Sequence, residues 1–322
     1  MISIQSILDR ARDSRILVVG DMMIDVYDFC CAAHSRPSPE FPDKRVYTAS
    51  RSEKMLGGAG NVAANLALLG VNTSLLSICG DDGNALEARR LCEVSRIHRS
   101  LLMDRSRPTP VKTRLYIDDH YLLRGDDEQV HKVSPELSDA IIREFEQTLD
   151  HVDAVILSDY NKGFFTAENA RNMIALCRTR SIPVVVDLKP PNAALFSGAT
   201  VVAPNLKEAR EISPGFDPYQ KETSLKILHD VLGAEQVAVT IGGEGILVYR
   251  NGNTSHIPGR KVTTVDSCGC GDTVRACLTL GLVVGLSLTD SAVFANYAAS
   301  LAVQKLGTST LTPDELLKEH TI

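Results

Sequence analysis

The segment DAVILSDYNKGFFTAENARNMIALCRTRSIPVVVD, residues 153–187, decides the fold. It opens with the apolar run DAVILS at 153–158 and closes with IPVVVD at 182–187, and a helical pattern near 166–179 lies between them. Continuous apolar runs rich in valine and isoleucine are typical of strands buried on both faces. The segment therefore predicts two parallel strands joined by a covering helix.

The same alternation continues on both sides of this segment. We expect further strands at 15–20, 73–79, 200–203 and 236–241. Further helices are expected near 58–69, 84–95, 135–149, 221–232, 271–285 and 289–305. The fold class that follows is α/β, with an open, doubly wound and mostly parallel sheet flanked by helices.

Two stretches interrupt the alternation. Residues 32–50 are rich in proline and charge, and residues 111–124 contain KTRLYI and YLLR on either side of the turn 118–120. We interpret the second stretch as a hairpin and the two together as a small β flap inserted in the main layer. With 44% hydrophobic residues, the 322-residue chain can bury one large core, so we expect a single domain over 1–322.

Composition and charge exclude several classes of protein. The formal net charge of −6 comes from mixed acids and bases, which argues against a polybasic face for nucleic acid or anionic lipid. Asp9, Arg10 and Arg12 stand where a signal peptide would be apolar, so we expect an amphipathic helix there, and the apolar stretch 276–286 is too short to cross a bilayer. The cysteines lack the paired CxxC spacing of a zinc site, and free thiols fit a reducing cytoplasm.

The first of two glycine clusters, GGAGNVA at 57–63, mimics a dinucleotide-binding fingerprint. That fingerprint should follow a hydrophobic strand, whereas RSEKML precedes this cluster at 51–56. The expected first strand, at 15–20, runs instead into Asp21-Met22-Met23. The context therefore argues against a nicotinamide-dependent dehydrogenase.

The second cluster, DSCGCGDT at 266–273, runs directly into an apolar helix. Glycines at a helix start let backbone N–H groups surround an anion, which also meets the positive end of the helix dipole. Asp272 would face that same anion, which is explicable if Asp272 accepts a proton from an attacking hydroxyl. The alternative is that Asp272 only caps the helix, which would contribute about 1 kcal/mol of stability and no catalysis.

In an open parallel sheet, ligands bind beyond the carboxyl ends of the strands. The polar residues directly after the expected strands therefore mark the place to look. They are Asp21, Asp25, residues 159–163, residues 187–189 and Asn205.

Three elements of this sequence resemble the ribokinase-like carbohydrate kinases. DSCGCGDT is similar to the family signature DTxGAGD, and GGAGNVAANLALLG at 57–70 is similar to its GG element followed by asparagine. PNLKE at 204–208 resembles the NxxE motif that is associated with the magnesium and phosphate region. The three elements occur in the family order over most of the chain, and they imply a ribokinase-like fold.

Within that superfamily, longer stretches look like the kinase domain of heptose 7-phosphate kinases. They are GDMMIDVY at 20–27, SPE at 38–40, LSDYNKG at 157–163, APNLKEA at 203–209 and KLGTSTLTPDEL at 305–316. The resemblance implies transfer of a phosphoryl group from ATP, with Mg²⁺, to the anomeric hydroxyl of a heptose 7-phosphate, giving the 1,7-bisphosphate. It also implies a pathway toward cell-envelope lipopolysaccharide.

The resemblance assigns roles to individual residues. Asp272 would be the catalytic base, and the main chain of Gly269, Cys270 and Gly271 would form the anion hole. Sugar hydroxyls would be held by Asp21, Gly57, Gly58 and Asn61. Asn205 and Glu208 would act on Mg²⁺ through water. The residues expected at the nucleotide are Lys189, Asn205, Glu208, Thr240, Gly243, Gly245 and Asn296.

The chain carries thiols at Cys268 and Cys270 within the family signature, the second of them where alanine is usual. Since main-chain groups build the anion hole, we expect activity to survive, and a thiol in an electropositive loop would have a lowered pKa and be oxidisable. The substrate's own phosphate needs a cation, and Lys162 is the residue we assign to it. The other candidates are Arg36, Lys44, Arg45, Arg114 and Arg124.

Two alternatives stay open at this point. A ribokinase-like kinase for another sugar, sugar phosphate or nucleoside would keep the chemistry and change the flap contacts. A non-catalytic sugar- or nucleotide-binding regulator is disfavoured by the intact Asp272, Asn205 and Glu208. The flap has exposed β edges, which invite pairing, so we expect a homodimer.

Overall fold

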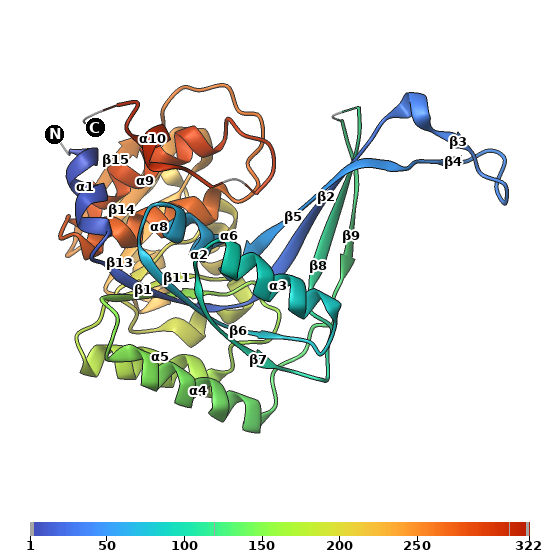
Figure 1. Cartoon of the computed structure of the whole chain (residues 1–322). Coiled ribbons are helices and arrows are strands. Elements are labelled where there is room, and N and C mark those ends of the chain that lie inside the picture. Colours follow the sequence, from blue (N-terminus) through green and yellow to red (C-terminus); the bar gives the residue numbers. More distant parts are fainter. Residues whose placement is uncertain (1–2, 119, 309, 320–321) are drawn as a thin grey trace.

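The computed structural model describes residues 3–118, 120–308, 310–319 and 322, and it places a large sheet between two layers of helices (Figure 1). Among the described residues the sheet has nine strands. Their order across it is β15 (Asn253–Pro258), β14 (Gly245–Arg250), β13 (Gln236–Thr240), β12 (Val201–Val202), β11 (Val184–Asp187), β10 (Ala154–Ser158), β1 (Arg15–Gly20), β6 (Asn72–Cys79) and β7 (His98–Met103).

The strands from β7 to β13 are parallel, and β14 and β15 are antiparallel at one edge. The doubly wound, mostly parallel sheet predicted from the sequence is confirmed. The sequence analysis missed β7, β14 and β15. Two of these, β7 and β15, are the edge strands and are partly exposed, so their residues lack the continuous apolar run that marks the inner strands.

The helices divide between the two faces of the sheet, as their buried residues show. One layer contains α1 (Ile4–Ala11), α2 (Ala59–Leu68), α3 (Gly83–Val94), α8 (Cys270–Val283), α9 (Leu288–Ala302) and α10 (Pro313–Leu316). The other contains α4 (Pro135–Leu149), α5 (Ala167–Thr179), α6 (Leu206–Ile212) and α7 (Lys221–Leu232). Short 3-10 turns lie at η1 (Ala32–His34), η2 (Pro190–Phe196), η3 (Pro218–Gln220) and η4 (Gly242–Glu244).

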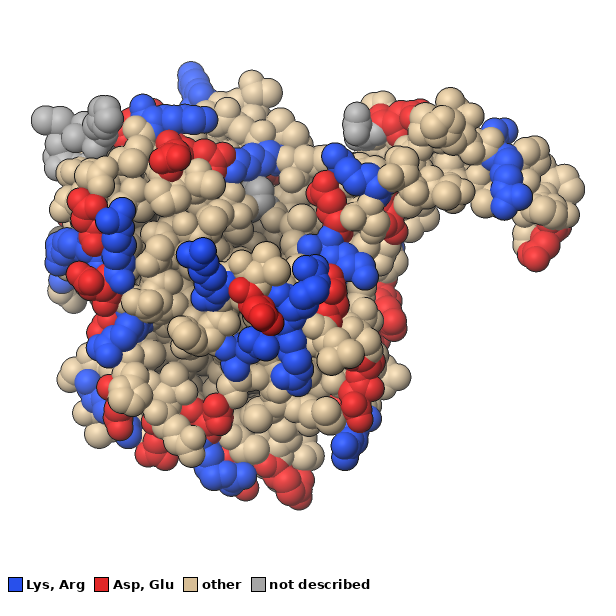
Figure 2. All heavy atoms as spheres, viewed as in Figure 1, with Lys and Arg blue, Asp and Glu red and all other residues tan. Residues whose placement is uncertain are grey.

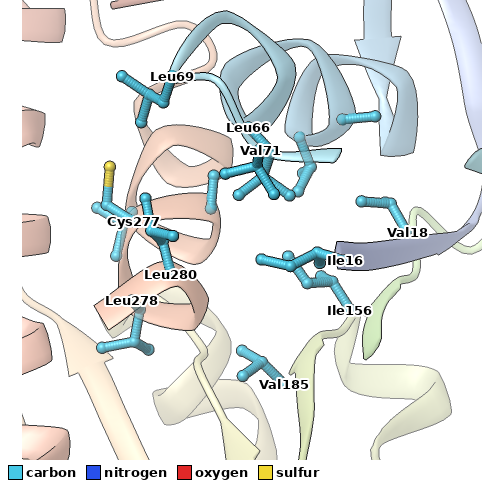
Figure 3. Packing of buried hydrophobic residues seen from close by; sticks show 14 of the residues in the cluster. Ile16, Val18, Leu66, Leu69, Val71, Ile156, Val185, Cys277, Leu278 and Leu280 are labelled. Carbon is cyan, nitrogen blue, oxygen red and sulfur yellow. The ribbon is translucent and has the colours of Figure 1, made fainter. Parts of the chain in front are cut away.

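Helix α8 is central to the first layer. Figure 3 shows Leu278 and Leu280 of α8 in the same apolar cluster as Leu66 of α2 and Ile16 and Val185 of the sheet. These five side chains are at most 1% exposed, which makes them well-packed core residues. Truncation of such a leucine to alanine typically costs about 2–5 kcal/mol of stability. The start of α8 is therefore held firmly above the carboxyl ends of the strands.

A second, four-stranded sheet projects from the end of the main sheet, and we call it the lid sheet (Figure 1). Its order is β5 (Ala49–Gly58), β2 (Met22–Cys30), β8 (Val111–Ile117) and β9 (His120–Asp127). The hairpin expected at 111–124 is confirmed as β8 and β9, although residue 119 of its turn lies outside the described residues. Beyond the lid sheet, β3 (Arg36–Pro37) and β4 (Arg45–Val46) form a small arm.

The boundaries expected for the flap need correction. Besides β8 and β9, the lid sheet contains residues 22–30 and 49–58. Of the expected stretch 32–50, only residues 49–50 belong to the lid sheet, and residues 32–48 form the arm and its connections. A strand does precede the glycine pair at 57–58, but it is polar, exposed over residues 49–54 and antiparallel to β2. Strand β5 was not predicted because it has no apolar run, and β2 was not predicted because Asp25 and Asp28 interrupt its apolar residues.

The surface visible in Figure 2 carries basic and acidic side chains side by side. This mixture agrees with the net charge of −6. Over the described residues, every helix is too short or too polar to span a bilayer.

Candidate active site

Asp272 lies in the first turn of α8, and its carboxylate is held from two sides. Asn61 of α2 donates from Nδ2 to one oxygen at 2.7 Å, and the Tyr160 hydroxyl donates to the other at 2.6 Å. The helix starts at Gly269 in the left-handed conformation, with φ of 73°. Three segments far apart in sequence therefore converge on one carboxylate.

The electrostatic setting of Asp272 suits a proton acceptor. The side chain is buried, and this burial raises the pKa of Asp272 above its ordinary value. The hydrogen bonds from Tyr160 and Asn61 and the charge of Arg275 lower it. A carboxylate whose pKa is raised binds a proton more readily than one in water, which is the property that a general base requires.

A cavity of about 1040 Å³ adjoins the loop before α8. Cys270 and Gly271, the first two residues of α8, line it together with residues from β13, η4 and α9. Of the residues assigned to the nucleotide from the sequence, the cavity brings together Asn205, Thr240, Gly243, Gly245 and Asn296. Its size is at the upper end for a small-molecule site and is sufficient for a nucleoside triphosphate.

Four charged side chains form a network beside this cavity. Lys189 donates from Nζ to Glu208 at 2.6 Å, and Arg275 lies 2.9 Å from Asp187 and 3.9 Å from Glu208. Burial raises the pKa of Asp187 to about 6, although the charges of Arg275 and Lys189 lower it. The network places two cations and two carboxylates at the ends of β11 and the start of α6, where the sequence predicted a phosphate and magnesium region.

Asn205 and Glu208 also form a capping box. The Asn205 side chain accepts from the Glu208 backbone N–H at 2.9 Å, and the Glu208 carboxylate accepts from the Asn205 backbone N–H at 2.9 Å. This arrangement starts α6 and fixes both side chains. Over the described residues, no group of three or more His, Cys, Asp or Glu is placed to hold a metal. Glu208 and Asp187 are buried carboxylates, and carboxylate oxygens are ligands that suit a hydrated Mg²⁺ whose other ligands are water and phosphate.

The lid sheet contributes a buried polar cluster opposite Asp272. Arg114 of β8 donates to Asp25 of β2 at 2.7 Å, and the Thr308 hydroxyl donates to the other Asp25 oxygen at 3.0 Å. The Tyr27 hydroxyl lies 2.7 Å from the Thr308 hydroxyl. Gly57 packs against Asp25 so closely that an added Cβ would meet its Oδ2. These contacts tie the lid sheet to the loop that follows α9.

Lys162 lies at the rim of this region in an ionic cluster. Its Nζ is bound to Glu128, and the second oxygen of Glu128 lies 3.4 Å from Nζ of Lys112. Lys112 also contacts Asp126 at 2.8 Å. Two lysines from different segments thus face each other across one acidic residue.

Asp21 is buried and accepts hydrogen bonds from the backbone N–H groups of Tyr160, Lys162 and Phe164 at 2.8, 3.1 and 3.3 Å. Burial raises the pKa of Asp21 to about 6, and these hydrogen bonds lower it. The contacts give Asp21 the task of shaping the loop 159–164. Its assignment to a sugar hydroxyl stays a prediction from the resemblance. Gly58 sits beside the backbone of Asp21, at the junction of β5 and α2.

The two cysteines of the loop differ in their surroundings. Cys270 begins α8 and lines the cavity, and burial raises the pKa of its thiol. The expectation of a lowered pKa is therefore wrong for Cys270, because burial outweighs the lowering by Arg275. Cys268 lies 3.5 Å from the Tyr27 hydroxyl and lines a separate hollow of about 330 Å³ with Arg114 and His120.

Three of the basic residues considered for the sugar phosphate lie elsewhere. Arg36, Lys44 and Arg45 belong to the arm, which Figure 1 shows projecting away from the main layer. The expectation that these three residues lie near the site is therefore wrong, because residues 32–48 run outward along the arm. Arg124 pairs with Asp126 and remains at the rim of the lid sheet.

Tyr160, Arg275 and Asp25 were not among the site residues predicted from the sequence. Tyr160 and Asp25 follow expected strands, which was the available signal, and the structure places both at the site. Arg275 is a charge inside an otherwise apolar helix, and such a residue is seldom buried without a partner or a task. The sequence therefore indicated that Arg275 has a partner or a task, although no role was predicted for it.

Comparisons with known proteins agree with this architecture. The chain is 35% identical over 320 residues to the bifunctional protein HldE of Syntrophotalea carbinolica, an alignment that covers 98% of this chain and 64% of the relative. It is 38% identical over 311 residues to the bifunctional protein HldE of Bradyrhizobium diazoefficiens, covering 94% and 62%. The chain spans less than two thirds of the length of these relatives.

Solved structures resemble the fold closely. Phosphofructokinase-2 from Escherichia coli in complex with potassium gives a TM-score of 0.78 at 17% identity and covers 95% of this chain and 97% of that one. Ribokinase from Thermotoga maritima gives 0.69 at 19% identity, with 95% and 98% covered. A sequence model of the pfkB family of carbohydrate kinases matches residues 13–315. The chain has the ribokinase-like fold and belongs to the pfkB family of carbohydrate kinases, and it is a sugar kinase.

Proposed function

We propose that this kinase transfers the γ-phosphoryl group of ATP to the anomeric hydroxyl of a heptose 7-phosphate and forms the 1,7-bisphosphate. The observation that carries the proposal is the position of Asp272, buried between Asn61 and Tyr160 at the start of α8 and next to a nucleotide-sized cavity. The stretches that resemble heptose 7-phosphate kinases and the identity to proteins named HldE support the choice of sugar.

In the proposed reaction, the main chain of Gly269, Cys270 and Gly271 surrounds the phosphoryl group that is transferred. Asp272 accepts the proton of the anomeric hydroxyl as the new O–P bond forms and the bond to ADP breaks. When bound, Mg²⁺ would neutralise phosphate charge, with Asn205 and Glu208, and Asp187 beside them, holding its water ligands.

The sugar would lie between the lid sheet and Asp272. Asp25, Gly57 and Asn61 offer a carboxylate, close backbone approach and an amide, which are the groups that recognise a polyol. Lys162, with Lys112 behind Glu128, would receive the sugar phosphate as an anion that displaces the acidic side chain. A kinase of another sugar would keep Asp272 and differ at these lid contacts. The free thiols fit a reducing compartment, and we place the reaction in the cytoplasm.

The first test is Asp272→Asn in a coupled assay of ADP release with ATP, Mg²⁺ and a panel of sugar phosphates. The wild type should release ADP with heptose 7-phosphate, and mass spectrometry should show the 1,7-bisphosphate. Loss of a positioned base lowers kcat by about 10²–10⁴.

The matched control is Asp290→Asn, which also removes an acid from the first turn of a helix, in α9. It should keep the wild-type kcat. Undiminished sugar-stimulated ADP release by Asp272→Asn would refute the base, and preference for another sugar would refute the substrate.

A further inference from the structure

Arg275 is a buried cation three residues after the proposed base. It is 3% exposed, although it belongs to α8, whose other inward residues are mostly apolar or small. A buried arginine must have its charge balanced and its donors bonded, because an unpaired charge or donor costs several kcal/mol. Its contacts therefore indicate what the residue is for.

The free protein satisfies Arg275 only in part. One terminal nitrogen, Nη2, donates to the Ala203 carbonyl at 2.7 Å and lies 2.9 Å from Asp187. Nε is buried and has no hydrogen-bond partner among the described residues. Burial lowers the pKa of Arg275, but the carboxylates of Asp187 and Glu208 outweigh it, so the side chain stays charged. One buried donor without a partner costs about 1–3 kcal/mol.

The guanidinium is next to the main chain that would surround the phosphate. Nη1 packs against Gly271, where an added Cβ would collide with it. Arg275 also lines the 1040 Å³ cavity together with Cys270 and Gly271. A cation with one unbonded donor, Nε, thus borders the space that a triphosphate would enter, on the wall formed by the glycine loop.

The charges at this wall of the cavity also favour a contact between Arg275 and the nucleotide. Three buried carboxylates, Asp187, Glu208 and Asp272, lie around the place where a polyphosphate must bind. Lys189 and Arg275 are the cations in contact with Asp187 and Glu208 within the described part of the chain. Without Arg275, the site would repel the nucleotide more strongly.

We propose that Arg275 binds the γ-phosphoryl group of the nucleotide and stabilises its charge during transfer. In the free protein Asp187 and Glu208 hold the guanidinium in place. When the nucleotide arrives, the planar fork of Arg275 offers its remaining donors to the phosphate oxygens, and a guanidinium suits this because it binds phosphate through two parallel hydrogen bonds. The proposal rests on the ATP-dependent function argued above.

A purely structural role would be a buried ion pair that joins α8 to β11. Replacement of such a pair by an apolar side chain of similar volume is often tolerated. The two roles predict different results in one measurement. If Arg275 binds the γ-phosphoryl group, its replacement weakens binding of a triphosphate more than binding of a diphosphate, whereas a purely structural role affects both equally.

The test compares binding of AMP-PNP and ADP, both with Mg²⁺, by titration calorimetry on wild type, Arg275→Met and Arg275→Lys. We expect Arg275→Met to lose about tenfold or more in affinity for AMP-PNP and less than about threefold for ADP, because only AMP-PNP carries a γ-phosphate. Its kcat should fall by about 10²–10³. Arg275→Lys should keep part of the AMP-PNP affinity, since it retains the charge and loses the fork.

The matched control is Arg107→Met, which removes another buried arginine, paired with Asp104 through Nε at 2.6 Å. It should lower the melting temperature without changing the ratio of the two affinities. Equal weakening of AMP-PNP and ADP in the Arg275 variants would overturn the proposal, and Arg275→Lys decides alone if the methionine variant does not fold. Failure of the wild type to bind either nucleotide would instead overturn the ATP-dependent function.

Discussion

Tyr160 and Asn61 divide the two oxygens of Asp272 between them, so each of these side chains tunes the proposed base. Tyr160 lies in turn beneath Lys189, whose Nζ is 5.1 Å from the centre of its ring. Tyr160 therefore contacts both the proposed base, Asp272, and the ammonium group of Lys189. A substitution of Tyr160 should therefore change proton transfer to Asp272 more than it changes the stability of the fold.

Tyr160→Phe provides a prediction about pH. The hydrogen bond from Tyr160 lowers the pKa of Asp272, so its removal should raise that pKa. Because Asp272 must be ionised to accept a proton, kcat/KM rises with pH through this pKa, and the acidic limb should move by about one pH unit toward higher pH. The pH profile of ADP release measures this. Tyr219→Phe removes a tyrosine hydrogen bond to Glu244 and should leave the limb in place, whereas an unmoved limb in Tyr160→Phe would contradict the role.

The residues that could be predicted from the sequence are those with a fixed chemical context. Asp272 follows a glycine loop at a helix start, and this context indicated a phosphate site, with Asp272 as either a base or a helix cap until the family resemblance favoured the base. Arg275 and Tyr160 could not be assigned in this way, since their roles depend on Asp187 and Asp272, which only the folded chain brings to them. A charge inside an apolar helix was a signal of importance, without indicating its partner.

At the scale of elements, the loop before α8 depends on one glycine. Gly269 has φ of 73°, and a Cβ added there would lie 2.9 Å from Nδ2 of Asn61 and 3.1 Å from Cγ2 of Thr308. The same glycine thus permits the turn and leaves room for the amide that holds Asp272. The helix start and the partner helix α2 are consequently coupled.

Gly269→Ala should therefore damage both stability and catalysis. The left-handed conformation costs an L-residue about 1–2 kcal/mol, which urea denaturation would detect. Displacement of Asn61 should lower kcat by about 10–100-fold. The control is Gly252→Ala in the turn between β14 and β15, where φ is 80° and an added Cβ meets nothing within 4 Å. It should lose similar stability and keep its kcat; equal kcat in both variants would contradict the coupling.

The elements themselves were predictable to differing degrees. Inner strands such as β10 and β11 are buried on both faces, and their apolar runs identified them directly. The lid strand β5 is held by pairing with β2 rather than by an apolar face, so its sequence resembles a loop. Patterns of hydrophobicity report burial, and they therefore fail for strands that remain in solvent.

On the scale of the whole molecule, the lid sheet ends in two edge strands within the described chain, β5 and β9, and the outer edge of β9 is unpaired. Strand β9 is exposed along its whole length, and Tyr121, Leu122 and Leu123 are each about half exposed. An open edge with apolar side chains favours association with another strand. We expect the chain to form a homodimer through the lid sheets.

Sedimentation or light scattering tests this prediction. The wild type should have about twice the 35.0 kDa mass of one chain, and Leu122→Lys should shift it toward the monomer, because a lysine on an edge strand opposes pairing. Leu86→Lys is the control, since Leu86 is an exposed leucine of α3 outside the lid sheet. A wild type that sediments as a monomer would contradict the expected assembly.

The base and the amide that holds it come from helices that begin at Ala59 and Cys270, far apart along the polypeptide. A nascent chain that has not reached Cys270 already contains α2 and all nine described strands of the main sheet, yet it lacks the proposed base Asp272. Catalytic competence should consequently arise late and abruptly during translation.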